Sequence, residues 1–164
     1  MIDVGDVYLT KIQKGDEDLL KALWTNEEVR RYLGGTRPLN HLHDALTTMI
    51  DETQGAYFAI RETATHVSIG LMSITPYHDG QRQELSYQIL PTYWGQGIAY
   101  RCACTMLEYA RNTLQLSELV AETQYKNHRS RRLLHKLGMQ EEREIVRFGE
   151  PQVVYAITFP DSSS

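Results

Sequence analysis

Cysteine is scarce in this chain of 164 residues, which contains only Cys102 and Cys104. The two lie two positions apart in a segment with helical periodicity, so their side chains point in different directions and a disulfide between them is not expected. A Cys-x-Cys pair without a second pair of ligands is a poor metal signal, and the six histidines show no ligand spacing. We therefore expect no disulfide, no metal site and no cysteine nucleophile.

Long hydrophobic runs are absent as well. No apolar stretch approaches the roughly 20 residues of a membrane-spanning helix, and residues 1–6 lack the basic and apolar regions of a secretory signal. These absences predict a cytoplasmic protein with no membrane partner. The net charge of −4 disfavours nucleic acid as a partner, because binding to phosphate backbones is dominated by basic side chains.

The remaining composition is that of an ordinary globular protein, with 41% hydrophobic and 23% charged residues. The length predicts a single domain over residues 1–164. Periodicity and turn residues predict strands at residues 3–13, 56–61, 67–75, 84–90, 118–124, 140–148 and 153–159. They predict helices at residues 17–24 (continued by a turn at 29–33), 41–52, 98–114 and 128–137. This order indicates an α/β fold with a mixed sheet of about seven strands flanked by about four helices.

A glycine-rich stretch follows the predicted strand 84–90 and opens an apolar helix. It reads Tyr93, Trp94, Gly95, Gln96, Gly97, Ile98 and Ala99. Glycines leave room for a ligand, and the first backbone N–H groups of a helix lie unpaired at the positive end of its dipole, so the turn predicts a phosphate site. It is neither a P-loop, which needs Gly-Lys-Ser/Thr, nor a dinucleotide fingerprint, because Tyr100 replaces the third small residue. The alternative is a turn that only needs positive φ at its glycines.

A second block begins about thirty residues after this loop. Asn127 is predicted to cap a helix with Leu133, Leu134 and Leu137 as its buried stripe, and Gly138 to end it. The loop and this block together resemble the GNAT superfamily of N-acetyltransferases, in particular the branch of the ribosomal-protein N-terminal acetyltransferases. In that branch the loop typically reads Tyr-Trp-Gly-x-Gly-hydrophobic-Ala, and the later block reads Asn-x-x-Ser before a Leu-rich helix that ends in Leu-Gly-Phe. The resemblance extends over residues 7–159 and is sharpest at 84–139.

The resemblance implies the GNAT fold and acetyl-CoA as co-substrate. It implies that strand 84–90 is bulged and splays from the next strand, which frees the backbone of Ile89, Leu90 and Pro91 for the pantetheine arm and the thioester. An N–H of Ile89 or Leu90 would then serve as an oxyanion donor. The cofactor-binding residues expected further along the chain are Trp94, Gly95, Gln96, Gly97, Ile98 and Ala99 for the pyrophosphate, with Asn127 and Ser130 near the pantetheine arm.

The resemblance also suggests which residues move protons. Glu84 is the predicted general base, because related enzymes often use a carboxylate of this strand, commonly through water. Many relatives supply a Tyr as the acid four residues before the Gly of the later block, where this chain has Leu134. Ser130, one helical turn earlier, is the predicted substitute, and water, Tyr87 and Tyr125 are the alternatives.

Basic side chains follow both motifs. Arg101 lies in the first helical turn after the loop and is a candidate phosphate contact. A candidate for the 3′-phosphate of coenzyme A is one of Arg129, Arg131, Arg132 and Lys136. A solvated helix face is the alternative for that group.

The acceptor is expected to be a primary amine, either a protein N-terminus or a small molecule such as an amino acid, a polyamine or an aminoglycoside. A peptide acceptor needs an open cleft, whereas a small amine is best bound by acidic residues in a closed pocket. The acidic candidates are Asp44, Asp51 and Glu52, and the aromatic candidates for the pocket are Trp24, Tyr32 and Tyr77. Without the usual Tyr, a non-catalytic acetyl-CoA sensor or interaction module is the alternative function. Dimers are common in this branch, so a homodimer stays open as the assembly.

Overall fold

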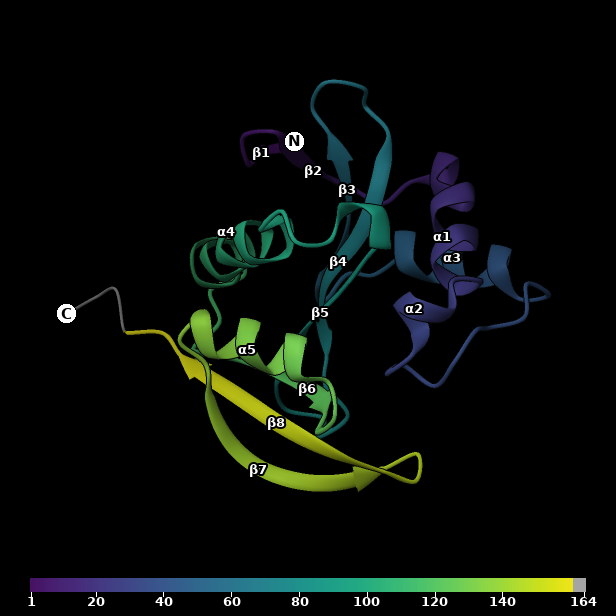
Figure 1. Cartoon of the computed structure of the whole chain (residues 1–164). Helices are drawn as coiled ribbons and strands as arrows, with labels where there is room; N and C mark the ends of the chain where they lie inside the picture. Colours follow the sequence, from purple (N-terminus) through teal and green to yellow (C-terminus); the bar gives the residue numbers. More distant parts are fainter. Residues whose placement is uncertain (161–164) are drawn as a thin grey trace.

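The computed structural model describes residues 1–160, which form one eight-stranded mixed sheet with helices on both faces (Figure 1). The strand order is β1-β2-β3-β4-β5-β6-β8-β7, and β5 and β6 are the parallel pair. The strands are β1 (Ile2–Asp3), β2 (Val7–Lys11), β3 (Ala56–Glu62), β4 (Ser68–Pro76), β5 (Gln83–Ile89), β6 (Glu118–Gln124), β7 (Gln140–Arg147) and β8 (Glu150–Thr158).

The helices divide between the two faces of the sheet (Figure 1). One face carries α1 (Glu17–Trp24), α2 (Glu27–Arg30) and α3 (Leu42–Ile50), and the other carries α4 (Ile98–Asn112) and α5 (His128–Lys136). Short 3-10 turns, η1 (Lys14–Asp16) and η2 (Pro91–Tyr93), precede α1 and the loop into α4. Helix α4 is the crossover that a parallel strand pair requires.

The two halves of the sheet separate between β5 and β6. A single residue pair, Glu84 with Val120, joins these strands, whereas β4 and β5 pair along seven positions. Beyond Glu84 the two strands diverge, which confirms the predicted splay. The expected bulge is not found, because β5 keeps an unbroken register with β4 from Gln83 to Ile89.

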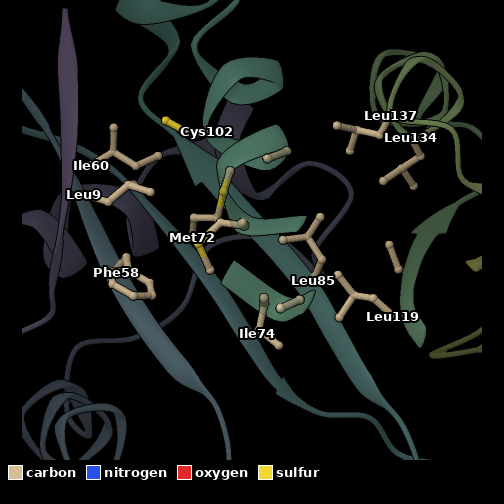
Figure 2. Packing of buried hydrophobic residues seen from close by; sticks show 14 of the residues in the cluster. Leu9, Phe58, Ile60, Met72, Ile74, Leu85, Cys102, Leu119, Leu134 and Leu137 are labelled. Atoms are coloured by element: carbon tan, nitrogen blue, oxygen red, sulfur yellow. The ribbon is translucent and has the colours of Figure 1, made fainter. Parts of the chain in front are cut away.

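The core holds the two halves in place on either side of this gap. In the larger cluster, Met72 of β4 and Leu85 of β5 pack with Leu119 of β6 and with Leu134 and Leu137 at the end of α5 (Figure 2). A second cluster packs α1 and α3 against the opposite face of β3 and β4. Leu85 and Ile89 of β5 are buried in the larger cluster, and this packing holds the strand in place beside the gap.

Side chains alternate along β5 and divide between the two faces. Leu85, Tyr87 and Ile89 belong to the cluster of α4 and α5. Ser86 and Gln88 therefore face the side of α1, α2 and α3. The side chains of β5 beside the gap therefore reach both faces of the sheet.

Three predicted elements differ from the structure. The strand expected at 3–13 is two strands, because Gly5 adopts a left-handed φ of 89° and turns the chain between β1 and β2, which makes the sheet eight-stranded. The turn expected at 29–33 is α2, a fifth helix that begins earlier, where Asn26 accepts a hydrogen bond from the N–H of Val29. The final turn lies at Phe148 and Gly149, which both have positive φ, so β8 begins before residue 153.

Candidate functional site

A cavity of about 780 Å³ opens where β5 and β6 separate. Its walls come from the end of β5, the loop before α4, β6 with α5, and α2 with the residues after it. The predicted site residues in these walls are Ile89, Trp94, Gly95, Gly97, Ile98, Ala99, Asn127 and Ser130. The structure thus brings the two sequence motifs together in one cavity.

The glycine loop presents unpaired backbone donors to this cavity. Gly97 caps α4 with a left-handed φ of 75°, and Gly95 has a φ of 79°. A Cβ at Gly95 would meet nothing within 4 Å, so the space beside it is open. The N–H of Arg101 bonds the carbonyl of Gly97, and the N–H groups before it in α4 have no partner within the helix. The glycines therefore supply positive φ and also form a cradle suited to an anion.

The end of β5 directs one backbone N–H toward the gap. The N–H of Leu90 bonds the carbonyl of Ile69 at 2.9 Å, so Leu90 is not a free oxyanion donor, contrary to one of the two expectations. Because backbone groups alternate along a strand, the N–H and carbonyl of Ile89 point the other way, toward β6. The indole N–H of Trp94 donates to that carbonyl at 2.7 Å. The N–H of Ile89 is left as the donor that faces the cavity.

Several predicted cofactor residues lie outside the cavity wall, namely Leu90, Pro91 and Gln96. Arg101, expected near a phosphate, lies outside it as well. Its guanidinium donates to the carboxylate of Asp6 at 2.6 Å and to the carbonyl of Val4 at 3.3 Å. Arg101 therefore ties the turn between β1 and β2 to the first turn of α4.

Glu84 lies where the two strands part. The backbone N–H of Glu122 on β6 favours the charged form of the Glu84 carboxyl group. Burial, with the neighbouring charge of Glu122, raises the pKa of Glu84 to about 7, against the opposing effects of Arg147 and of the backbone N–H. Glu84 is not part of the cavity wall, whereas Glu122 is. A carboxyl group that titrates near neutral pH beside the cavity is suited to exchange protons with it through water.

Glu122 is a site residue that the sequence analysis missed. Its carboxylate oxygens lie 2.5 Å from the hydroxyl of Tyr77, 2.9 Å from Nε2 of His78 and 2.7 Å from the guanidinium of Arg147. Burial favours a higher pKa for Glu122, but these hydrogen bonds outweigh it and hold the pKa below its ordinary value. The resulting fixed charge favours the protonated form of Glu84. A charged residue directly after the apolar run Leu119, Val120 and Ala121 was the available signal.

Ser130 meets a tyrosine in the cavity. The hydroxyl of Tyr87 on β5 lies 3.0 Å from Oγ of Ser130 on α5, so the pair bridges the gap between the strands. Asn127 fixes the start of α5, because its side-chain oxygen accepts the N–H of Ser130 at 3.2 Å. Burial raises the pKa of Tyr87, so its hydroxyl stays protonated at neutral pH. Leu134 is buried in the core, and Tyr125 is exposed outside the cavity wall.

Three cations of α5 line the cavity, namely Arg129, Arg132 and Lys136. The guanidinium of Arg129 lies 4.4 Å from the centre of the Trp94 ring, and the ammonium of Lys136 lies 4.1 Å from that of Tyr100. Both cations are therefore held at the glycine loop. Arg131 turns away toward β7 and β8, where it bonds Tyr155 and Glu141.

The wall opposite α5 is formed by α2 and the residues that follow it, which are Glu28, Val29, Arg30, Arg31, Tyr32 and Leu33. Of the three aromatic candidates, Tyr32 lines the cavity, whereas Trp24 and Tyr77 are buried in the core. The acidic candidates lie outside the wall, on α3 or just after it, and are Asp44, Asp51 and Glu52.

Within residues 1–160, no group of three or more His, Cys, Asp and Glu side chains is placed to hold a metal ion. No helix in the described part of the chain is long and apolar enough to cross a membrane. Burial on α4 raises the pKa of the Cys102 thiol to about 12, which makes that thiol a poor nucleophile.

Residues 6–140 match the sequence model of a family described as "Acetyltransferase (GNAT) domain". The chain is also similar to YoaA of Bacillus subtilis (strain 168), an N-acetyltransferase that is itself uncharacterised. The two are 27% identical over 151 residues, which cover 87% of this chain and 84% of the relative.

Solved structures share the fold. The spermidine N-acetyltransferase of Vibrio cholerae, in complex with CoA and spermine, has a TM-score of 0.81 at 18% identity, with 93% of this chain and 95% of that chain covered. The ribosomal-protein-S5-alanine acetyltransferase of Vibrio fischeri has a TM-score of 0.75 at 16% identity, with 96% and 95% covered. The predicted superfamily is thus confirmed, and the architecture is the α/β GNAT fold.

Proposed function

Because the chain belongs to the GNAT family of acetyltransferases, and is thereby an acetyl-CoA-dependent N-acetyltransferase, we propose that it acetylates a primary amine by direct attack in a ternary complex. The amine belongs to a protein N-terminus or to a small molecule. One observation carries this proposal: the cavity at the β5–β6 gap joins an anion cradle, an inward backbone N–H and a proton-accepting carboxyl group.

In this proposal the glycine loop and the end of β5 bind different parts of acetyl-CoA. The pyrophosphate lies on the backbone N–H groups of the glycine loop and of the first turn of α4, at Gly95, Gly97 and Ala99, because this turn carries the positive end of the helix dipole. The pantetheine arm lies between Ile89 and Asn127. The N–H of Ile89 donates to the thioester oxygen as negative charge develops there, an interaction worth roughly 3 kcal/mol for a well-placed donor.

Glu84 is the general base in the proposed reaction. An ammonium group must lose a proton before its nitrogen can attack, and a carboxylate with a pKa of about 7 is both available and basic enough at neutral pH. Since Glu84 lies behind the wall formed by Glu122, one water relays the proton from the amine to the carboxylate.

Ser130 and Tyr87 supply the acid. The amine nitrogen forms a bond with the carbonyl carbon, the carbon–sulfur bond breaks, and the sulfur leaves as a thiolate. Oγ–H of Ser130 gives its proton to the sulfur, and the Tyr87 hydroxyl, 3.0 Å away, returns one to Ser130. The second proton that the nitrogen loses as the amide forms passes through water to Tyr87 and restores its hydroxyl. In this proposal the pair takes the role of the general acid that a tyrosine has in the family, where this chain has Leu134. The lack of that tyrosine is then no argument for a non-catalytic sensor.

The test is release of coenzyme A thiol from acetyl-CoA with N-terminal peptides, amino acids, polyamines and aminoglycosides as acceptors. We expect release with one class, a loss of about 100-fold or more in kcat for Glu84→Gln, and a loss of about tenfold or more for Ser130→Ala and Tyr87→Phe. The control, Glu144→Gln, changes an exposed carboxylate of β7 and should keep full activity. Acetyl-CoA binding without release from any acceptor would favour the sensor instead.

A further inference from the structure

The cavity and the chain as a whole carry opposite charges. The chain has 17 Lys and Arg against 21 Asp and Glu. Among residues 1–160, however, six Lys and Arg side chains and only two carboxylates line the cavity. Three of the cations lie on α5, and two of them, Arg129 and Lys136, are held at the glycine loop, where they suit the phosphates of coenzyme A. The remaining three cations lie elsewhere in the wall and are Arg30, Arg31 and Lys126. Lys126 lies 3.7 Å from the carboxylate of Glu150, which leaves the two arginines. They require a separate explanation.

The positive charge at α2 is not neutralised by the protein. The guanidinium of Arg30 donates to the carbonyls of Leu33 and Gly35, which are neutral acceptors. Burial lowers the pKa of Arg30, and the nearby charge of Arg37 lowers it further, so a second cation lies beside it. Arg31 is exposed at the cavity wall, and no carboxylate within residues 1–160 lies within ion-pair distance of it.

The two carboxylates of the wall cannot reverse this charge. The carboxylate of Glu122 already accepts hydrogen bonds from Tyr77, His78 and Arg147, and its side chain is only 6% exposed. Glu28 alone remains for a cationic ligand. A polyamine, which carries several separated ammonium groups, would therefore meet more cations than anions at this wall.

We propose that the acceptor is a small amine that carries a carboxylate, and that Arg31 binds this carboxylate, with Arg30 adding its charge behind. The inference rests on the proposed function and narrows its acceptor. A guanidinium fork matches a carboxylate in two parallel hydrogen bonds, which fixes the orientation of the ligand as well as its charge. The carboxylate takes no part in bond making. It directs the amine toward the thioester, where nitrogen–carbon bond formation and thiolate loss proceed as above.

The experiment compares acceptors that differ only in the anionic group. Coenzyme A thiol release is measured with amino acids and with their carboxamides, with peptides that bear Asp or Asn at the second position, and with spermidine. Each is run with the unmodified protein, with Arg31→Gln, and with the control Arg111→Gln. Arg111 is an exposed residue of α4 that lies outside the cavity wall.

We expect kcat/KM to be about tenfold or more higher for the carboxylate of each pair, because a charge-assisted fork is lost in the amide. Arg31→Gln should remove this preference through KM, and leave the KM for acetyl-CoA and the rates with amides unchanged. A preference for acidic peptides over free amino acids would mean that the bound carboxylate belongs to a peptide, which overturns the small-amine part of the proposal.

Equal rates within each pair, or a preference for spermidine, would overturn the inference while leaving the acetyltransferase proposal intact. Acetyl-CoA binding with no release from any acceptor would instead overturn the proposed function. The two failures are therefore distinguishable in one set of assays.

Discussion

Replacing Glu84 by Gln should stabilise the folded protein at neutral pH while removing its activity. The pKa of Glu84 is about 7 in the folded chain against an ordinary value of 4.5. Between these values the folded state holds the proton more tightly than the unfolded state, so the free energy of unfolding falls as pH rises from about 4.5 to about 7. The difference of about 2.5 between the two pKa values corresponds to about 3 kcal/mol.

Glutamine avoids this cost, because it carries no charge and has nearly the same shape as glutamate. In thermal unfolding at pH 8, Glu84→Gln should melt roughly 5–10 °C above the unmodified protein. This difference in melting temperature should disappear near pH 4.5. The matched control is Glu144→Gln, since Glu144 is exposed on β7 and has no buried charge to remove. A variant that is no more stable than the unmodified protein at pH 8, or a difference in melting temperature that does not change with pH, would refute the reasoning.

Further predictions concern catalysis, the loop, the core and the corrected arginine. The value of kcat/KM should rise with pH through about 7 as Glu84 loses its proton, and a flat pH profile would count against this base. Gly97→Ala places a side chain at φ 75° and should weaken acetyl-CoA binding in calorimetry, at a cost of about 1 kcal/mol in stability; unchanged affinity would contradict the cradle. Leu134→Ala, at a core position with 1% exposure, should lose about 2–5 kcal/mol in urea unfolding, whereas a smaller loss would mean that the site collapses around the cavity. Arg101→Gln should leave acetyl-CoA affinity unchanged, because Arg101 is paired with Asp6, and a weaker affinity would return Arg101 to the phosphate site.

Local chemistry explains why the phosphate loop and the start of α5 could be predicted. Gly95 and Gly97 adopt positive φ, a conformation that the sequence specifies almost by itself. Asn127 caps its helix through a contact three residues away with Ser130. These features depend on neighbours in the chain, so periodicity and capping rules are sufficient to find them.

The errors arise where partners are distant in sequence. The choice between Ile89 and Leu90 as donor depends on the register with β4, which decides the direction of each N–H. Arg101 pairs with Asp6, which lies 95 residues earlier in the chain. Glu122 draws its partners from the end of β7 and from the loop after β4. Sequence spacing carries no information about such contacts, so the electrostatics of the site had to come from the structure.

The central claim is tested most directly by following a labelled acetyl group from acetyl-CoA in the presence of the preferred amine. The account predicts that label appears on the amine in amounts equal to the coenzyme A released, that none is attached to the protein when the amine is omitted, and that Glu84→Gln slows both products together. Label bound covalently to the protein before amine is added, or thiol release without an acetylated amine, would contradict direct transfer at the β5–β6 gap.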